Sequence, residues 1–308
     1  LRWLFIDYCE LQNNDLRIIP FIKAIEAPTV QSMHSNPTSN PFSRLPTLFV
    51  PHGAPTFALR SGAAGAALQA FAKHLPPVRA VVIISAHWET PTPTVGFAVR
   101  PETIHDFYGF PEPLYAIQYP ATGCPEVAEE VAKAIEAAGI TRTPVTRDPQ
   151  KGLDHGAWIP LRLLFPNADV PVVPLSLPWR GDATAAYRLG QSLTGLREKG
   201  ILVIGSGSMT HNLRDYQMQR ALPYVSQFAN WFAERVAAND IPALLDYRNQ
   251  APHAVHAHPS QEHLLPFFVA LGAAGKAGET FSGQRFYSGI DDYAIAMDAY
   301  AFYQGEKP

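Results

Sequence analysis

Hydrophobic residues gather in short runs that alternate with amphipathic stretches, and three of these runs lead directly to a histidine. AVVIISAHW is continuous, rich in β-branched residues and contains His87 near its end, LPTLFV precedes His52, and ILVIGSGSMT precedes His211. A continuous apolar run is typical of a strand buried on both faces in a parallel sheet that helices cover. Ligands bind at the carboxyl edge of such sheets, so the three histidines indicate a site there.

The segments between the runs have the pattern of helices. In residues 124–138, Val127, Val131 and Ile135 recur at i, i+4 and i+8, and Gly139 follows as a stop. Alternating elements predict an α/β fold with a mostly parallel central sheet, helices on both faces (an αβα sandwich) and a site at the C-terminal edge of the strands. Beyond the runs above, we expect strands at 94–99, 140–146, 170–177, 280–286 and 293–300, and helices at 63–74, 183–199, 221–237 and 241–247 and in the apolar segment up to Phe165.

Prolines limit two of these elements. Pro171 and Pro174 each remove a hydrogen-bond donor from the strand at 170–177, which predicts an edge position or a bulge. The ring of Pro266 clashes with the carbonyl four residues earlier unless the proline lies in the first turn of a helix. The last helix is therefore expected to begin near Glu262 or His263.

Residues 1–44 differ from the rest of the chain. Residues 1–33 match no element of the alternating pattern and lack the n-region and cleavage site of a secretory signal, and residues 34–43 are a polar linker rich in Pro, Ser and Asn. We expect 1–44 to be an N-terminal appendage and linker, with Met33 as an alternative natural start and a short helix as the alternative structure. Residues 45–308 are expected to form a single catalytic α/β domain.

Composition excludes several classes of partner. The 308 residues are 47% hydrophobic and 17% charged, the net charge is −3, and there is no basic block or stripe, so nucleic acid is not expected as a partner. A membrane is not expected either, because no apolar stretch approaches the roughly 18 residues that span a bilayer. Cys9 and Cys124 show no metal or CxxC spacing, and we expect a cytoplasmic protein.

The histidines carry the candidate chemistry. Of the 11 histidines, five lie in tight contexts of small or aromatic residues: His52, His87, His155, His211 and His263. Imidazoles gathered at one sheet edge would repel one another if protonated and would need many partners if neutral. A divalent metal resolves both problems, since it binds neutral imidazole nitrogen at about 2.0–2.1 Å. The spacing is neither that of a zinc finger nor HExxH, so Fe(II) and Zn(II) both stay open.

The ordered motifs PHGAP, SAHWE, IHDFYGFP, LDHGAW, SMTHNL and EHLLP resemble those of the DODA-type branch of the class III extradiol ring-cleavage dioxygenases, in the LigB-like superfamily. The resemblance covers about residues 45–298. It implies a metal-dependent enzyme that opens a catechol-type, DOPA-like ring with O₂, beside the two hydroxyls. A small aromatic diol and O₂ would then be the partners, and the enzyme would be a monomer or a small homo-oligomer.

The resemblance also implies roles for individual residues. The metal ligands would be His52, His87 and His263, and His211 would be the acid/base residue, close enough to join the coordination when no substrate is bound. His155 would lie near the oxygen site. The residues expected to line the substrate loop are His105, Tyr108 and Phe110.

Aromatic and acidic residues near these motifs suggest a surrounding shell. Trp88 and Trp158, with Tyr108 and Phe110, would form apolar walls that hold a flat ring, or else would be ordinary core aromatics. Asp106 and Asp154 flank site histidines and are candidates to orient them.

The third metal ligand has two candidates. The protocatechuate-cleaving branch of the superfamily uses a glutamate in this region, and Glu262 directly precedes His263. Neighbours on a helix point about 100° apart, so we expect only one of them to face the ion. The DODA-type motif ends in a histidine here, which favours His263, whereas Glu262 would complete a 2-His-1-carboxylate triad.

Two other functions fit the same residues. A histidine-rich site suits Zn(II) as well as Fe(II), so a zinc-dependent hydrolase is one alternative. A non-catalytic, Memo-like metal-binding protein is the other.

Overall fold

The computed structural model describes residues 45–216, 218, 220–275 and 281–305, so the predictions for residues 1–44 lie outside the described residues. A six-stranded sheet with the strand order β6-β2-β8-β1-β12-β9 forms the centre. The pairs β6/β2, β2/β8 and β8/β1 are parallel, and β12 is antiparallel to both β1 and β9. The prediction of a mostly parallel α/β sheet is confirmed. The strands are β1 (Thr47–Pro51), β2 (Ala80–Ser85), β6 (Val172–Pro174), β8 (Ile201–Gly207), β9 (Phe281–Tyr287) and β12 (Ala299–Gln304).

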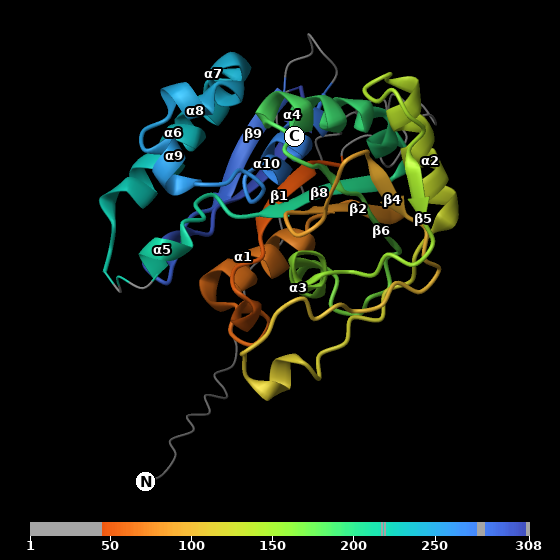
Figure 1. Ribbon diagram of the computed structural model, residues 1–308, viewed down its shortest axis with the longest axis horizontal. Helices are drawn as coiled ribbons and strands as arrows, with labels where there is room; N and C mark the ends of the chain where they lie inside the picture. The colour runs from red at the N-terminus through yellow and green to blue at the C-terminus, as the bar shows by residue number, and fades with distance from the viewer. Residues whose placement is uncertain (1–44, 217, 219, 276–280, 306–308) are drawn as a thin grey trace, which may run out of the picture. The chain divides into compact units, whose positions relative to one another are not determined.

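Alternate residues of the central strands face two different helical layers. Val82 and Ile84 pack in one apolar cluster with α2 (Pro125–Ala137), α4 (Ala183–Ser192) and α10 (Leu265–Ala273). Val81 and Ile83 pack in a second cluster with α1 (Gly62–Ala72) and α3 (His155–Leu164). Figure 1 shows α1 and α3 below the sheet and α4 above it. Burial on both faces explains why these strands read as continuous apolar runs.

The strand that carries two prolines lies at the edge of the sheet. β6 pairs only with β2 in the sheet order, and Pro171 contributes its carbonyl, which accepts from Val81 N at 2.8 Å. The expected edge position is confirmed, because β6 is the terminal strand in the sheet order. The chain then continues into β7 (Leu177–Pro178), which pairs in parallel with β3 (Glu89–Thr90).

Two expected strands differ from the structure. The strand expected at 140–146 is β5 (Thr146–Asp148), paired with β4 (Thr94–Gly96), because the Thr141 hydroxyl donates to Thr143 O at 3.0 Å and folds the preceding residues into a turn. The strand expected at 293–300 is divided into β11 (Ile295–Ala296) and β12. Asp292 and Tyr293 have φ of 47° and 64°, in the left-handed region that ends a strand, and β10 (Ile290–Asp291) folds back onto β11.

Two expected helices also have different bounds. The helix expected at 183–199 ends at Ser192 and continues as the 3₁₀-helix η3 (Thr194–Lys199), where the Ser192 and Thr194 hydroxyls bond to carbonyls three residues earlier. The helix expected near Glu262 or His263 begins at Leu265, with residues 262–264 in a turn. Pro266 has no N–H to donate to the Glu262 carbonyl, so an α-helix cannot form from residue 262.

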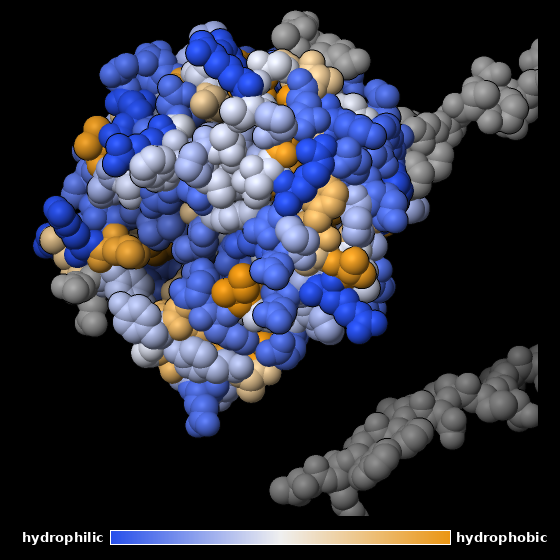
Figure 2. All heavy atoms as spheres, turned by 45° about the vertical axis from the view of Figure 1, so that its right-hand side comes forward, coloured by the Kyte–Doolittle hydropathy of each residue, from blue (hydrophilic) through white to orange (hydrophobic). Residues whose placement is uncertain are grey.

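The remaining α-helices follow β8 in the chain, and two further 3₁₀-helices precede it. They are α5 (Leu213–Tyr216), α6 (Pro223–Ala237), α7 (Ile241–Leu245), α8 (Tyr247–Gln250), α9 (Ala254–Ala257), and the 3₁₀-helices η1 (Pro55–Ala58) and η2 (Glu112–Leu114). On the face shown in Figure 2, hydrophilic residues predominate and hydrophobic residues occur singly or in small groups. Within the described part of the chain, no helix has the length and apolar character needed to cross a bilayer.

Candidate metal centre

Five histidines meet at the carboxyl edge of the parallel strands. His52 directly follows β1, His87 follows β2, and His211 lies four residues beyond β8. His155 is the first residue of α3, and His263 lies in the turn before α10. The ring centroids of the three histidines expected to bind the metal are 4.9, 4.9 and 5.4 Å apart: His52–His87, His87–His263 and His52–His263. Segments far apart in the sequence therefore deliver their imidazoles to one place.

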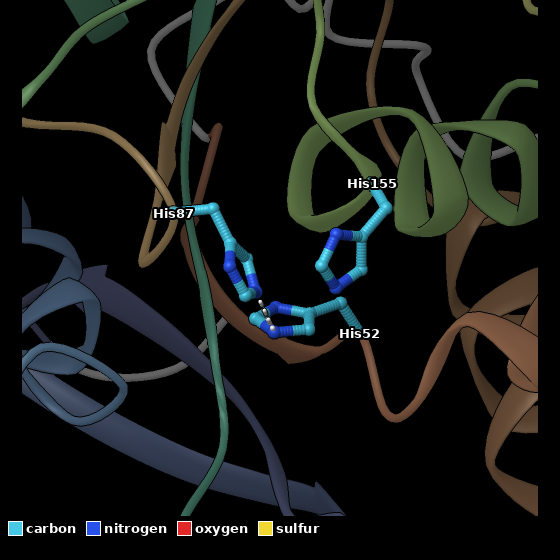
Figure 3. A group of neighbouring side chains, drawn as sticks. All are labelled: His52, His87 and His155. Atoms are coloured by element: carbon cyan, nitrogen blue, oxygen red, sulfur yellow. Dashed lines mark hydrogen bonds between the residues drawn. The ribbon is translucent and has the colours of Figure 1, made fainter. Parts of the chain in front are cut away.

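His52, His87 and His155, here named the strand group, each offer one ring nitrogen within 4.8 Å of the others. Figure 3 shows the three rings turned toward one another from two loops and the start of α3. The Nε2 atoms of His52 and His87 are 3.1 Å apart. Two ligands at about 2.0–2.1 Å from one ion in tetrahedral geometry have nearly this separation. The donor set and spacing thus fit a divalent metal.

A buried serine fixes the orientation of His52. The Ser206 hydroxyl lies 3.0 Å from His52 Nδ1 and donates its proton to Gly156 O at 2.5 Å. Because the hydroxyl has only one proton, its oxygen must accept from Nδ1–H of His52. The other ring nitrogen, Nε2, is then unprotonated and faces the site.

Asp106 orients His155. Its Oδ1 accepts from both the backbone N and Nδ1 of His155 at 2.9 Å, and its Oδ2 lies 4.0 Å from Nδ1 of His87. Burial disfavours the charged carboxylate, but the hydrogen bonds and charge of His155 outweigh it and lower the pKa of Asp106 to about 2. Asp106 is therefore ionised at neutral pH and holds Nε2 of His155 toward the centre.

A second carboxylate, Asp154, joins β2 to α3. It accepts from the Ser85 hydroxyl at 2.5 Å and, as the N-cap of α3, from Ala157 N at 3.2 Å. The Ser85 oxygen in turn accepts from His87 N at 3.2 Å. A Cβ on Gly156 would lie 2.3 Å from Ser85 Oγ and 2.9 Å from a carbon of the His87 ring. Glycine at this position allows α3 to approach β2 closely, which explains the LDHGAW motif.

His211, Glu262 and His263, here named the loop group, form the second set of ligand atoms within 4.8 Å of one another. The rings of His211 and His263 stack with centroids 3.4 Å apart and planes 8° apart. Glu262 Oε1 lies 3.1 Å from Nδ1 of His263, so the carboxylate accepts from Nδ1–H and leaves Nε2 of His263 free. Glu262 and His263 thus share one local arrangement in which the carboxylate orients the imidazole.

Burial favours the neutral form of four of these imidazoles, those of His52, His87, His211 and His263. It is the largest cause that lowers the pKa of His52 and of His263 well below the usual value, and the neighbouring histidines lower both further. Burial and the charge of His155 lower the pKa of His87 to about 4, and burial also lowers the pKa of His211. Neutral imidazole is the form that binds a metal. A cluster of neutral imidazoles therefore fits the binding of a metal cation.

A cavity of about 1010 Å³ opens onto the cluster. Four of the five histidines line it: His87, His155, His211 and His263. Phe107, Tyr108 and Phe110 form one side of the cavity, and Ile295 and Met297 lie elsewhere on its wall. A flat aromatic molecule could lie between these apolar side chains with its polar edge against the imidazoles.

The sequence matches, over residues 57–297, the family described as the catalytic LigB subunit of aromatic ring-opening dioxygenase. The chain belongs to the LigB family. It is 36% identical over 261 residues to "4,5-DOPA dioxygenase extradiol" of Beta vulgaris, which covers 83% of this chain and 96% of that protein. It is 38% identical over 204 residues to the protein of the same name from Mirabilis jalapa, covering 66% and 75%. The crystal structure of an uncharacterized Escherichia coli K12 protein matches with a TM-score of 0.69 and 27% identity, over 84% of this chain and 100% of that one.

These matches confirm the predicted family and enzyme class. The chain is a metal-dependent extradiol dioxygenase of the LigB family, and its substrate is an aromatic compound that reacts with O₂. The six motifs that pointed to the family all lie in or beside the histidine cluster or on the loop that borders the cavity.

Three residues expected to contact substrate lie away from the cavity wall of this LigB-family dioxygenase. Trp158 is fully buried in the core and donates from Nε1 to Ile104 O at 3.0 Å. His105 is 3.0 Å from Ile117 O through Nε2, within its own loop, and Trp88 lies under the Lys151 ammonium at 4.6 Å. For Trp158 the core interpretation is the right one, because the side chain is fully buried and its ring lies 5.9 Å from that of His105, on the inner side of the loop.

Other functional residues gave no clear signal in the sequence. Ser206 and Ser85 lie inside or at the end of apolar strands, where a serine reads as a strand residue. His258 is fully buried and lies 2.8 Å from Met209 O through Nε2, which supports the segment that carries His211. Arg60, Asp291 and Asp292 line the cavity but come from loops whose meeting only the tertiary structure reveals.

Proposed function

We propose that this LigB-family enzyme opens the ring of a catechol that carries a DOPA-like side chain, with Fe(II) bound by His52, His87 and His263. The observation that carries the proposal is the convergence of imidazoles at one edge of the sheet. The Nδ1 atoms of His52, His155 and His263 have hydrogen-bond partners in the protein, and the Nε2 atoms of His52 and His87 are 3.1 Å apart. The names of the Beta vulgaris and Mirabilis jalapa relatives support DOPA as the type of substrate. We also propose that residues 45–308 form the single domain that carries this activity.

In this proposal Glu262 does not bind the metal itself but orients the ligand His263. Its carboxylate is already hydrogen-bonded to Nδ1 of His263, the arrangement by which carboxylates fix the tautomer of metal-binding histidines. His263 is more deeply buried than Glu262, with side-chain exposures of 7% and 24%. The imidazole, and not the carboxylate, is therefore assigned as the third ligand.

A bound divalent ion would supply Lewis acidity to both catechol oxygens and a route for electron transfer to O₂. The chain supplies proton transfer and orientation. His211 lines the cavity, has a lowered pKa because it is buried, and is therefore neutral and able to accept a catechol proton near pH 7. Its ring, stacked on His263, lies within reach of a substrate bound beside that residue.

His155 approaches the same space from α3. With Nδ1–H bonded to ionised Asp106, its Nε2 faces the cavity and can exchange a hydrogen bond with bound oxygen or substrate atoms. The negative charge of Asp106 would stabilise the imidazolium if His155 took up a proton during the reaction. Phe107 and Phe110 on the same loop exclude water from that side.

Reconstitution with a defined metal tests the proposal. Metal-free protein is loaded anaerobically with Fe(II) or with Zn(II) and given L-DOPA, while oxygen uptake and the visible absorbance of a ring-opened product are followed. We expect stoichiometric oxygen uptake and a yellow product with Fe(II) and neither with Zn(II). Ester or amide hydrolysis with Zn(II), without oxygen uptake under any loading, would support the zinc-dependent hydrolase instead. Binding of metal without any turnover would leave the Memo-like alternative.

A further inference from the structure

The cavity has a charged region away from the histidines. Three of its lining side chains carry a fixed charge among the described residues: Arg60, Asp291 and Asp292. The histidines and aromatic residues are sufficient for a plain catechol, which has no charge to recognise. The charged side chains therefore indicate a further part of the ligand.

The positive charge lies on one segment of the wall. Arg60 follows η1, and its backbone N donates to Thr56 O at 3.0 Å, which ties it to the same short helical turn that lines the cavity. Its side chain is exposed, and none of the ion pairs formed by the described residues includes its guanidinium. A guanidinium that forms no ion pair within the described part of the chain is available to bind a carboxylate in bidentate fashion.

The negative charges lie on another segment, the turn between β10 and β11. Asp291 pairs with Ile295 across this hairpin, and Asp292 has a φ of 47°. Burial and the charge of Asp292 raise the pKa of Tyr216, which also lines the cavity. Burial and the charge of Asp292 raise the pKa of Asp291. No Lys or Arg among the described residues forms an ion pair with either carboxylate. A ligand cation would relieve the repulsion between the two.

We propose that Arg60 and the Asp291–Asp292 pair determine substrate specificity by binding the two charges of an α-amino acid side chain on the catechol. Arg60 binds the substrate carboxylate, and the aspartate pair binds the ammonium group. The two sets of charges belong to different segments and do not neutralise each other, so a zwitterion satisfies both. This inference rests on the proposed function, since it assumes that the catechol edge faces the histidines.

A substrate series tests the assignment on the Fe(II)-loaded enzyme. L-DOPA carries both charges, dopamine lacks the carboxylate, 3,4-dihydroxyphenylpropanoic acid lacks the ammonium, and 4-methylcatechol lacks both. We expect kcat/KM to fall in that general order, by roughly tenfold for each lost charge, the size of a charge-assisted hydrogen bond. Arg60→Gln should reduce the L-DOPA to dopamine ratio roughly tenfold, and Asp291→Asn/Asp292→Asn should reduce the ratio of L-DOPA to 3,4-dihydroxyphenylpropanoic acid.

Matched controls and a binding measurement separate the possible outcomes. Arg142→Gln and Asp169→Asn change exposed charges that do not line the cavity and should leave both ratios as in the unchanged protein. Anaerobic calorimetric titration with L-DOPA should show a weaker Kd for Arg60→Gln, independent of turnover. Equal kcat/KM for L-DOPA and 4-methylcatechol, or ratios unaffected by Arg60→Gln, would overturn the specificity assignment while the ring-opening function stands. No turnover of any catechol would instead overturn the proposed function.

Discussion

The strand group and the loop group hold their imidazoles in different ways. In the strand group, each ring or its backbone is hydrogen-bonded to a side chain: His52 to Ser206, His155 to Asp106, and His87 N to Ser85. In the loop group, Glu262 holds Nδ1 of His263 in the same way. His211 differs: its backbone N donates to Ala257 O at 2.9 Å and its ring stacks on His263, but the ring has no hydrogen bond among the described residues. A fixed imidazole suits a permanent metal ligand, whereas an imidazole without a fixed partner suits a group that exchanges protons.

The largest expected effect is the loss of a strand-group ligand. His52→Ala or His87→Ala should reduce both metal content and oxygen uptake by more than about 100-fold, beyond the range typical of an outer partner. Metal analysis of purified protein and oxygen-electrode assays measure the two quantities. His74→Ala, an exposed histidine of the same type, is the control and should change neither. Normal metal content in His52→Ala would exclude His52 from the ligand set.

Removing His211 should separate catalysis from metal binding. We expect His211→Ala to lower kcat by about 100-fold or more, the usual contribution of an acid/base residue, while most of the metal stays bound. Single-turnover absorbance and metal analysis on the same sample give the comparison. Full activity in this variant would remove His211 from proton transfer.

Asp106 tests whether the orientation of His155 matters. Asp106→Ala removes the acceptor for Nδ1–H and should lower kcat by about 10- to 100-fold. Asp106→Asn retains an oxygen acceptor without the charge, so its kcat should fall between those of Asp106→Ala and the unchanged protein. Equal losses in the two variants would mean that the charge alone is important.

The lowered pKa values predict how the metal-free protein responds to acid. The pKa of His87 is about 4 in the folded protein because of burial and the charge of His155, compared with about 6.5 in an unfolded chain. Between these values the unfolded chain binds a proton that the folded chain does not. The free energy of unfolding should therefore be highest above about pH 6.5 and fall toward pH 4. Urea titrations at pH 7, 6 and 5 measure this, and His87→Gln should show a smaller decrease than His74→Gln.

Glu262 is expected to give the smallest effect. Glu262→Gln retains an oxygen near Nδ1 of His263, so metal content should stay near that of the unchanged protein and kcat should fall by no more than about tenfold. Loss of the metal in this variant would mean that Glu262, and not His263, is the third metal ligand.

The positions of the site histidines could be predicted because parallel strands deliver the residues after their ends to one edge. His52 and His87 follow continuous apolar strands, and both meet at the centre. The direction of a side chain within a helix could not be predicted in the same way, so Trp158 was expected at the cavity although α3 turns it into the core. Periodicity gives no sign of which helix face meets the sheet when, as in α3, nearly every residue is buried.

Hydrogen bonds between side chains far apart in the sequence could not be predicted either. Ser206 orients His52 across 154 positions, and a serine within an apolar strand has no local pattern that predicts such a bond. The left-handed residues at 292 and 293 turn the chain between β10 and β11, so the expected strand begins only at Ile295, and Asp291 and Asp292 line the cavity. Asp292 is a residue type that tolerates the left-handed region, but Tyr293 is not, so the sequence does not mark residue 293 as part of the turn.

A crystal structure of the Fe(II)-loaded protein, with anomalous data collected at the iron edge, tests the central claim most directly. The account predicts one anomalous peak at the carboxyl edge of β1 and β2, bound by Nε2 of His52, His87 and His263. A peak bound through Glu262, or one that lies away from His52 and His87, would contradict it.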